Sequence, residues 1–231
     1  MSTDEKPDEK PHYAGHRQRL RERFLAADAS ALPDYELLEI LLFSAIPQKD
    51  VKPLAKTLLT RFKSLKGVIH AESAALREFG LSDSPIALFK AIAATHARMG
   101  QQSILNQPVL SSWSKIIDYC HSVMDHEKNE QLRLLFLNRK NMLIADEVQQ
   151  KGTIDHTPVY VREVIKRALE LGAGALILVH NHPSGDPSPS KEDISMTHAV
   201  IDAARAVGLS VHDHIIIGHG KHASLREMGL I

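Results

Sequence analysis

The chain contains a short run of five apolar residues followed by a histidine, Ala175–His180 (ALILVH), between two stretches of helical character. Val159–Leu171 precedes the run and is closed by Gly172, and Ser190–Val207 follows it. A run this short and this apolar predicts a central strand that is covered on both faces. The C-terminal half of the chain is therefore restricted to folds in which helices pack on both sides of a sheet.

The remaining elements of this half are predicted from their periodicity and turn residues. Asn141 lies in the expected turn of a hairpin. We expect a helix at Ser112–Met124, hairpin strands at Leu132–Asn138 and Met142–Gln149, and a last strand at Leu209–Gly218. The order helix, hairpin, helix, strand, helix, strand predicts an α/β domain with a mixed sheet over residues 111–231.

The N-terminal half has helical character throughout. Residues 1–12 are polar and rich in proline and charge, and we expect a disordered tail there. Residues 13–100 predict a small all-α domain, and residues 101–110 predict a linker. The candidate helices are His16–Ala27, Pro33–Phe43, Lys52–Phe62, Ser64–His70, Glu72–Phe79 and Pro85–Met99.

Composition excludes several classes of protein. No apolar run approaches the roughly 18 residues that a membrane-spanning helix needs, and the charged start MSTDEKPDEKPH is unlike a secretory signal. Cys120 is the only cysteine, so no intramolecular disulfide can form. We therefore expect a cytoplasmic protein with no membrane partner. Lys+Arg and Asp+Glu both total 28, so overall charge does not indicate a nucleic-acid partner.

The segment after the buried strand, His180–Asp193 (HNHPSGDPSPSKED), carries the residues most suited to chemistry. Residues two apart on an extended chain point to the same side, so His180 and His182 can converge. The prolines and the glycine keep the next residues in a loop. Ser190 can then cap a helix whose first turn contains Asp193, and the loop can bring that carboxylate back to the histidine pair.

Two imidazoles and one carboxylate leave one position of a tetrahedral metal site open for water. Catalytic zinc is bound in this way, whereas structural zinc sites are usually closed by four protein ligands. The alternative interpretation is a chance histidine pair at a strand end, followed by an ordinary helix entry. The combination of strand, HxHP, loop, serine and aspartate favours the metal site.

This spacing resembles a known motif. His180-x-His182-Pro183, six residues, Ser190, two residues and Asp193 match the JAMM (MPN+) metalloprotease motif position for position, and the fuller string is similar to the RadC branch (UPF0758) of that superfamily. The resemblance extends to GHRQRLRERFL, ELLEILLFSAIPQKDVKPLA, LFLNRKN and HDHIIIG. It implies a cytidine-deaminase-like JAMM/MPN fold with a mixed sheet, preceded by a helix-hairpin-helix-like module.

The resemblance also implies roles for individual residues. His180, His182 and Asp193 would hold Zn²⁺, which lowers the pKa of a bound water towards about 7. Glu130, just before the Leu132 strand, would act as the general base. Ser190 would donate a hydrogen bond to the tetrahedral oxyanion. Glu127 and Glu147 are the alternative candidates for the general base.

Three further histidines need an interpretation. His212-x-His214 in the last strand has the same one-face spacing as His180-x-His182. We interpret the pair as strand residues hydrogen-bonded near the site, with an orienting role for His214, and direct metal ligation is the alternative. His156, in the loop before Val159, either lines the substrate groove or is exposed.

The N-terminal half resembles the helix-hairpin-helix modules of RadC proteins, whose glycine-rich hairpins hold DNA phosphates through backbone N–H groups. The corresponding stretch, Phe79–Ser82 (FGLS), lacks the proline and the second glycine of that hairpin. A separate cluster of Arg17, Arg19, Arg21 and Arg23 spreads around a helix instead of forming one stripe. A solvated helix and a DNA-binding helix are both compatible with it.

Two functions follow from these observations. The first is a zinc-dependent hydrolase of the JAMM type, a metallopeptidase whose water, activated between Zn²⁺ and Glu130, cleaves a peptide or isopeptide substrate. The second is a DNA-associated accessory protein of repair or recombination, in which the metal site is structural or vestigial. The sequence identifies neither the substrate nor the oligomeric state.

Overall fold

The computed structural model describes residues 15–26, 32–47, 49–151 and 160–231. The chain divides into two compact units, Met1–Ala94 and Thr95–Ile231, which are described separately. The expected disordered tail, residues 1–12, and His156 lie outside the described residues. Among the described helices, none combines the length and the apolar character that a bilayer crossing requires.

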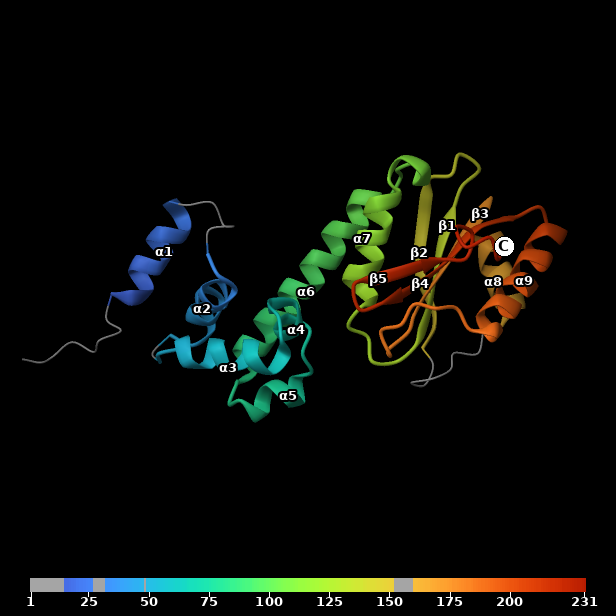
Figure 1. Ribbon diagram of the computed structural model, residues 1–231. Helices are drawn as coiled ribbons and strands as arrows, with labels where there is room; N and C mark the ends of the chain where they lie inside the picture. Colours follow the sequence, from blue (N-terminus) through green and yellow to red (C-terminus); the bar gives the residue numbers. More distant parts are fainter. Residues whose placement is uncertain (1–14, 27–31, 48, 152–159) are drawn as a thin grey trace, which may run out of the picture. The chain divides into compact units, whose positions relative to one another are not determined.

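The first unit is all-α, as the sequence predicts (Figure 1). Its helices enclose one core that includes Leu38, Leu42, Leu58 and Phe89, each fully buried. The helices are α1 (His16–Ala26), α2 (Asp34–Ala45), α3 (Lys52–Phe62), α4 (Leu65–Ile69), α5 (Ser73–Glu78) and the first part of α6 (Asp83–Ile104).

Two of the four clustered arginines attach α1 to the rest of this unit. Arg17 donates to the carbonyls of Pro47 at 2.6 Å and Ile46 at 2.8 Å, and its guanidinium lies 4.8 Å from the centre of the Phe43 ring. Arg23 is paired with Glu36 in the first turn of α2. These contacts give both arginines a role within the fold.

The second unit is an α/β domain with a five-stranded sheet in the order β2-β1-β3-β4-β5. β3 and β4 are parallel and the other neighbours are antiparallel, so the sheet is mixed, as predicted. Its elements are the end of α6, η2 (Val109–Ser111), α7 (Trp113–Met124), β1 (Gln131–Leu137), β2 (Leu143–Lys151), α8 (Val161–Glu170), β3 (Ala175–Asn181), α9 (Lys191–Ala206), β4 (Ser210–Gly218) and β5 (Lys221–Ser224).

Helices cover both faces of this sheet, with α7 on one side and α8 and α9 on the other (Figure 1). β3 is buried over its whole length, as its apolar sequence predicts. Ile177 and Val179 pack in the α7 layer, whereas Leu176 and Leu178 pack in the α8–α9 layer. Since side chains alternate along a strand, His180 lies on the α8–α9 face of the sheet.

Three features of this unit differ from the sequence prediction. Residues 101–104 continue α6 instead of starting a linker, because Ile104 is fully buried in the α7-side core. The isolated bridge of Leu105 with Leu143 then ties the following segment to the sheet. β5 was not predicted, because Lys221–Ser224 is short and has no apolar alternation. The short helix η2 was not predicted either, since it begins within the expected linker, and the remaining helices and strands agree with their predicted ranges to within a few residues.

A buried ion pair joins β1 to β2 beneath α7. The Nη1 atom of Arg133 donates to the two carboxylate oxygens of Asp146 at 2.6 and 2.7 Å. Tyr119 also donates to Asp146, and Gln101 of α6 donates to it at 3.3 Å. The Asp146 side chain is completely inaccessible to solvent and that of Arg133 is 13% exposed. The charge on each residue is therefore compensated within the protein.

Asp146→Asn is expected to lower the free energy of unfolding of this unit by about 3–5 kcal/mol, because it leaves the buried Arg133 charge without its counter-ion. Trp113, the only tryptophan, lies in this unit, so its fluorescence in a urea titration measures the change. Glu147→Gln on the same strand is the matched control, since Glu147 is partly exposed and pairs with a partly exposed Arg167. Equal losses in the two variants would contradict this explanation.

Candidate metal centre

The candidate site forms where β3 ends and α9 begins. His180 is the penultimate residue of β3 and is buried among the α8–α9 layer. The chain stays beside β4 for one residue beyond the end of β3, since the His182 amide donates to the Ile217 carbonyl of β4 at 2.9 Å. His180 and His182 therefore present their rings on the same face, and the ring centroids lie 4.7 Å apart.

The loop after His182 returns to the sheet through a close backbone approach. Gly185 has a φ of 87°, and a Cβ atom there would lie 1.9 Å from Nδ1 of His219. A side chain at this position would have to displace the His219 ring and adopt a backbone conformation that residues other than glycine rarely adopt. The loop then leads to Ser190, which caps α9.

A reciprocal capping box fixes Asp193 at the start of α9. The Ser190 hydroxyl accepts from the Asp193 amide at 3.0 Å, and the Asp193 carboxylate accepts from the Ser190 amide at 2.8 Å. The Ser190 hydroxyl also donates to the same carboxylate at 2.7 Å. This arrangement orients the carboxylate in the first helical turn towards the histidines.

The structure thus brings together the three side chains that the spacing predicts. The Nε2 atoms of His180 and His182 are 2.8 Å apart, and they lie 3.3 and 3.5 Å from the two oxygens of Asp193. Ligand atoms that lie about 2.1 Å from a tetrahedral zinc are roughly 3.4 Å from one another. Among the described residues this is the one group of three such side chains close enough to share an ion.

A buried hydrogen-bond chain determines which nitrogen of His180 carries the proton. The Thr197 hydroxyl donates to the carbonyl of Asp193 at 2.5 Å, so it must accept from Nδ1 of His214, 2.6 Å away. Neutral His214 then accepts at Nε2 from Nδ1 of His180 at 2.7 Å. The Nε2 atom of His180 is consequently unprotonated, and its lone pair faces Asp193 and His182.

His182 is oriented in a comparable way. Its Nδ1 lies 2.8 Å from the carbonyl of Asp186, which can only accept, so Nδ1 is the donor. When both histidines are neutral, two Nε2 lone pairs and one carboxylate therefore converge with no donor hydrogen among them; protonation of His182 would place a hydrogen there that Asp193 can accept. They repel one another unless a cation, a proton or a metal ion, lies between them. This donor set and its partial burial fit a divalent metal.

The electrostatic environment keeps His180 and His214 neutral. Burial lowers the pKa of His180 to about 4, and it lowers the pKa of His214 well below the usual range. The hydrogen bond with Asp193 raises the pKa of His182. Burial alone would raise the pKa of Asp193, but its interactions with His182, His180 and Ser190 lower it instead. Asp193 is therefore ionised, as a metal ligand must be.

Glu130 lies just before β1, beside the histidine pair. The β1–β3 register ends at the pair of Leu132 with His180, so Glu130 and His182 each lie two positions beyond the last paired residues at the same end of the two strands. The negative charge of Glu130 contributes to the raised pKa of His182. Its proposed role as general base agrees with this location, although the role itself stays a prediction.

Asn181, between the two histidines, was not singled out from the sequence. Its side chain is buried, accepts from the Gln131 amide at 3.0 Å and donates to the carbonyls of Asn129 at 3.1 Å and Glu127 at 3.3 Å. It thereby ties the segment that carries Glu130 to the end of β3. Thr197 was also missed, but it follows Asp193 by one helical turn, and that spacing could have indicated it.

The alternative candidates occupy different environments. Glu147 on β2 is bound by Arg167 through contacts of 2.8 and 2.6 Å, which lower its pKa. His212 does not join His214, since its Nε2 lies 2.7 Å from Oδ1 of Asn141. An irregularity in the β3–β4 register lies directly before Asp213, so the alternation is interrupted between the two histidines. The orienting position predicted for His214 agrees with its contact with His180.

The hairpin of the first unit keeps one of its expected conformational features. Gly80 has a φ of 77°, the left-handed conformation that glycine adopts readily. Ser82 is not among the residues of positive φ. The hairpin thus contains one residue in the left-handed conformation, Gly80. The DNA-binding hairpin has a second glycine, and the residue at that place here is Ser82.

Comparison with known families gives two matches. Residues 110–230 match the family model described as RadC-like JAB domain, and residues 1–83 match the model described as UPF0758 N-terminal. The first match includes β1–β5, Glu130 and all three residues of the candidate metal centre. The mixed sheet with helices on both faces is consistent with a JAB/MPN domain. The chain therefore belongs to the RadC family of JAB-domain proteins.

Proposed function

We propose that this protein is a zinc-dependent hydrolase that cleaves an amide bond in a peptide or isopeptide substrate. The observation that supports the proposal most strongly is the convergence of the His180 and His182 lone pairs on the Asp193 carboxylate. A divalent cation relieves this repulsion, and three protein ligands leave a fourth position for water. Zn²⁺ bound there would lower the pKa of that water and polarise the substrate carbonyl.

The residues around the metal supply the other requirements of hydrolysis. Glu130, on the side of His182, would accept a proton from the attacking water and transfer it to the leaving amine. Ser190 would donate its hydroxyl hydrogen to the oxyanion, and for this it must release the hydrogen bond that it makes to Asp193. The buried chain through His214 and Thr197 would hold His180 in the tautomer that binds metal.

The test is cleavage of a pooled set of internally quenched peptides, including lysine-linked isopeptides, by the full chain loaded with Zn²⁺. Cleavage by the wild type that is lost in His182→Ala and after chelation supports the proposal. His182 is suited to this test because its side chain is 19% exposed, so its removal disturbs the core less than removal of His180. Equal cleavage by wild type and His182→Ala would reject the site.

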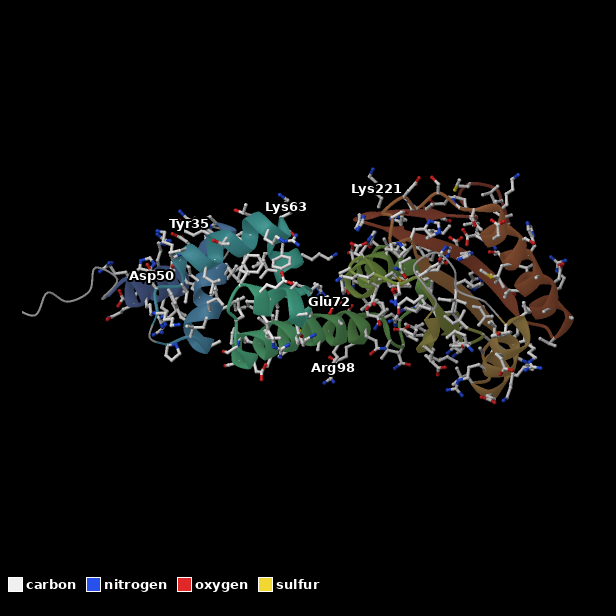
Figure 2. All side chains as sticks on the ribbon, turned by 90° about the horizontal axis from the view of Figure 1, so that it is seen from below. Tyr35, Asp50, Lys63, Glu72, Arg98 and Lys221 are labelled. Carbon is white, nitrogen blue, oxygen red and sulfur yellow. The ribbon has the colours of Figure 1, made fainter. Side chains whose placement is uncertain are left out.

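Association with DNA is the second candidate function, and one observation in the first unit favours it. A hollow of about 510 Å³ on α3 is lined by Lys56, Thr57, Thr60, Arg61 and Lys63, which include three cations and no carboxylate. Figure 2 shows Lys63 at the surface of this unit. Cationic and hydroxyl side chains of this kind contact phosphates without reading sequence.

The DNA proposal is tested by the salt dependence of binding to a short duplex. Removing one cation that neutralises a phosphate should reduce the slope of log K against log salt by about 0.9. Arg61→Gln with Lys63→Gln is therefore expected to lower both affinity and slope, whereas Arg162→Gln, an exposed arginine of the second unit, should change neither. Binding that is equal in all three proteins would reject this surface.

A further inference from the structure

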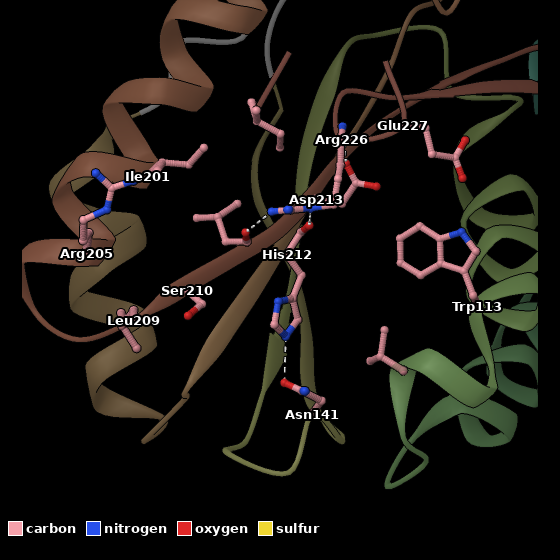
Figure 3. A pocket seen from close by; sticks show the side chains of 13 residues that line it. Trp113, Asn141, Ile201, Arg205, Leu209, Ser210, His212, Asp213, Arg226 and Glu227 are labelled. Atoms are coloured by element: carbon pink, nitrogen blue, oxygen red, sulfur yellow. Dashed lines mark hydrogen bonds between the residues drawn. The ribbon is translucent and has the colours of Figure 1, made fainter. Parts of the chain in front are cut away.

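The second unit also contains a cavity of about 800 Å³ (Figure 3). Its lining includes none of the three metal-centre residues. Ile201 and Arg205 of α9 lie on one side of it, Trp113 of α7 lies on the other, and His212 of β4 lies between them. Sites for small molecules in proteins typically occupy about 300–1,000 Å³.

The cavity exists because β5 covers only part of β4. β5 pairs with Ile215–Gly218, so of the described strands only β3 pairs with the first half of β4. Arg226 occupies part of the remaining edge, donating to the carbonyls of Val211 at 3.0 Å and of His212. The edge is thereby closed to a further strand at these carbonyls, while space remains beside it.

Six of the thirteen lining residues are apolar, and one of these six is aromatic. Val109, Ile201, Leu209, Val211 and Ile231 contribute aliphatic side chains, and Trp113 contributes its ring. An apolar surface with an indole favours a flat ligand, because aromatic rings stack with large buried area and a defined geometry.

The polar groups of the cavity differ in how far they are already hydrogen-bonded within the protein. The carboxylate of Asp213 is already engaged with the Ser224 hydroxyl at 2.5 Å and the Arg226 amide at 3.1 Å. Among the described residues Arg205 makes one long contact of 3.9 Å, with Asp202, and its side chain is 78% exposed. Its guanidinium therefore retains donors for an anion.

The charges at the two sides of the cavity also differ. Arg205 lies on the α9 side, whereas Glu227 lies on the side of Trp113 (Figure 3). Glu227 disfavours an anion near the indole, and the guanidinium of Arg226 is engaged with the carbonyls of Val211 and His212, so Arg205 is the lining cation with donors left for an anion. We propose that this cavity binds a small ligand with a flat aromatic body, which packs against Trp113, and one anionic group, which pairs with Arg205.

The single tryptophan makes the proposal directly measurable, since Trp113 is the only indole in the chain and lines the cavity. The probe is 1-anilinonaphthalene-8-sulfonate, added to the full chain while Trp113 emission is recorded. We expect saturable quenching at one probe per chain. N-phenyl-1-naphthylamine, which has the same rings without the sulfonate, should bind about 10-fold more weakly because it lacks the charged hydrogen bond.

Two substitutions of opposite sign test the orientation of the ligand. Arg205→Gln should weaken binding of the sulfonate probe about 10-fold, as removal of one charged hydrogen bond predicts. Glu227→Gln should leave that affinity unchanged or raise it. Arg162→Gln, an exposed arginine outside the cavity, is the matched control and should bind as the wild type does.

Ser210→Phe provides an independent variant, because Ser210 is an exposed residue of the lining whose enlargement fills the cavity. Loss of quenching in this variant, with an unchanged circular dichroism spectrum, supports the proposal. Unsaturable quenching, equal affinity for both naphthalene probes, or equal affinity of Arg205→Gln and wild type would overturn it. Those results would identify the probe as an adventitious additive only.

Discussion

Glu130→Gln is expected to lower the rate of zinc-dependent cleavage by about 10²–10⁴-fold, the usual contribution of a positioned general acid–base group. Glutamine keeps the shape of the side chain but has no carboxylate to accept the proton. Glu130 and His182 leave the β1–β3 pairing at the same end of the sheet, and the negative charge of Glu130 acts on His182, so Glu130 lies near the candidate metal centre. Since Glu130 is not one of the three converging ligands, the variant should retain its zinc.

Glu127→Gln is the matched control for this prediction. Glu127 belongs to the same segment, and its backbone carbonyl accepts from Asn181. Its variant should cleave at nearly the wild-type rate. A large loss in Glu127→Gln with full activity in Glu130→Gln would transfer the role of base to Glu127. A parallel loss of zinc and activity in Glu130→Gln would instead show that Glu130 supports the metal site.

Thr197→Val is expected to weaken zinc binding by about 10–100-fold, although Thr197 contacts no metal ligand side chain directly. Valine has the shape of threonine but cannot accept the hydrogen of His214 Nδ1, which lies 2.6 Å from the threonine hydroxyl. His214 can then carry its proton on Nε2, where it meets the proton on Nδ1 of His180. The tautomer of His180 that presents a lone pair to the metal is thereby destabilised.

Thr197→Ser separates this effect from simple loss of packing. Serine keeps the hydroxyl and removes one methyl group, so its zinc affinity should remain close to that of the wild type. The dissociation constants are measured by competition with a fluorescent chelator, and the melting temperatures of the metal-free proteins are recorded alongside. Equal zinc affinities for the valine and serine variants would contradict the orienting role of the hydrogen-bond chain.

The fold could be predicted where hydrophobic periodicity determines it. The run Ala175–His180 indicated a strand buried on both faces, and the helices that cover those faces are α7, α8 and α9. Hydrophobic periodicity was insufficient where tertiary contacts determine the end of a helix or the presence of a strand. Residues 101–104 have a polar, linker-like composition, but burial of Ile104 extends α6 through them. β5 depends on pairing with β4, which its own four residues do not reveal.

The three candidate ligands could be predicted from the sequence, whereas the residues that support them were harder to predict. His180, His182 and Asp193 have a spacing that follows from strand geometry and a capped helix. Asn181 acts through buried hydrogen bonds to residues about fifty positions away, and no local pattern identifies such a partner. Thr197 could have been indicated only by its place one helical turn after Asp193, since its contact with His214 crosses from α9 to β4. The difference between His212 and His214 arises from an irregular register that is invisible in the sequence.

The metal content of the full chain, purified without a histidine tag and without added zinc, tests the central claim most directly. The wild type should contain about one zinc per chain, as three converging protein ligands predict, and His182→Ala should contain almost none. Zinc added after chelation should raise the melting temperature of the wild type alone. Absence of metal from both proteins, with melting temperatures that zinc does not change, would contradict the account.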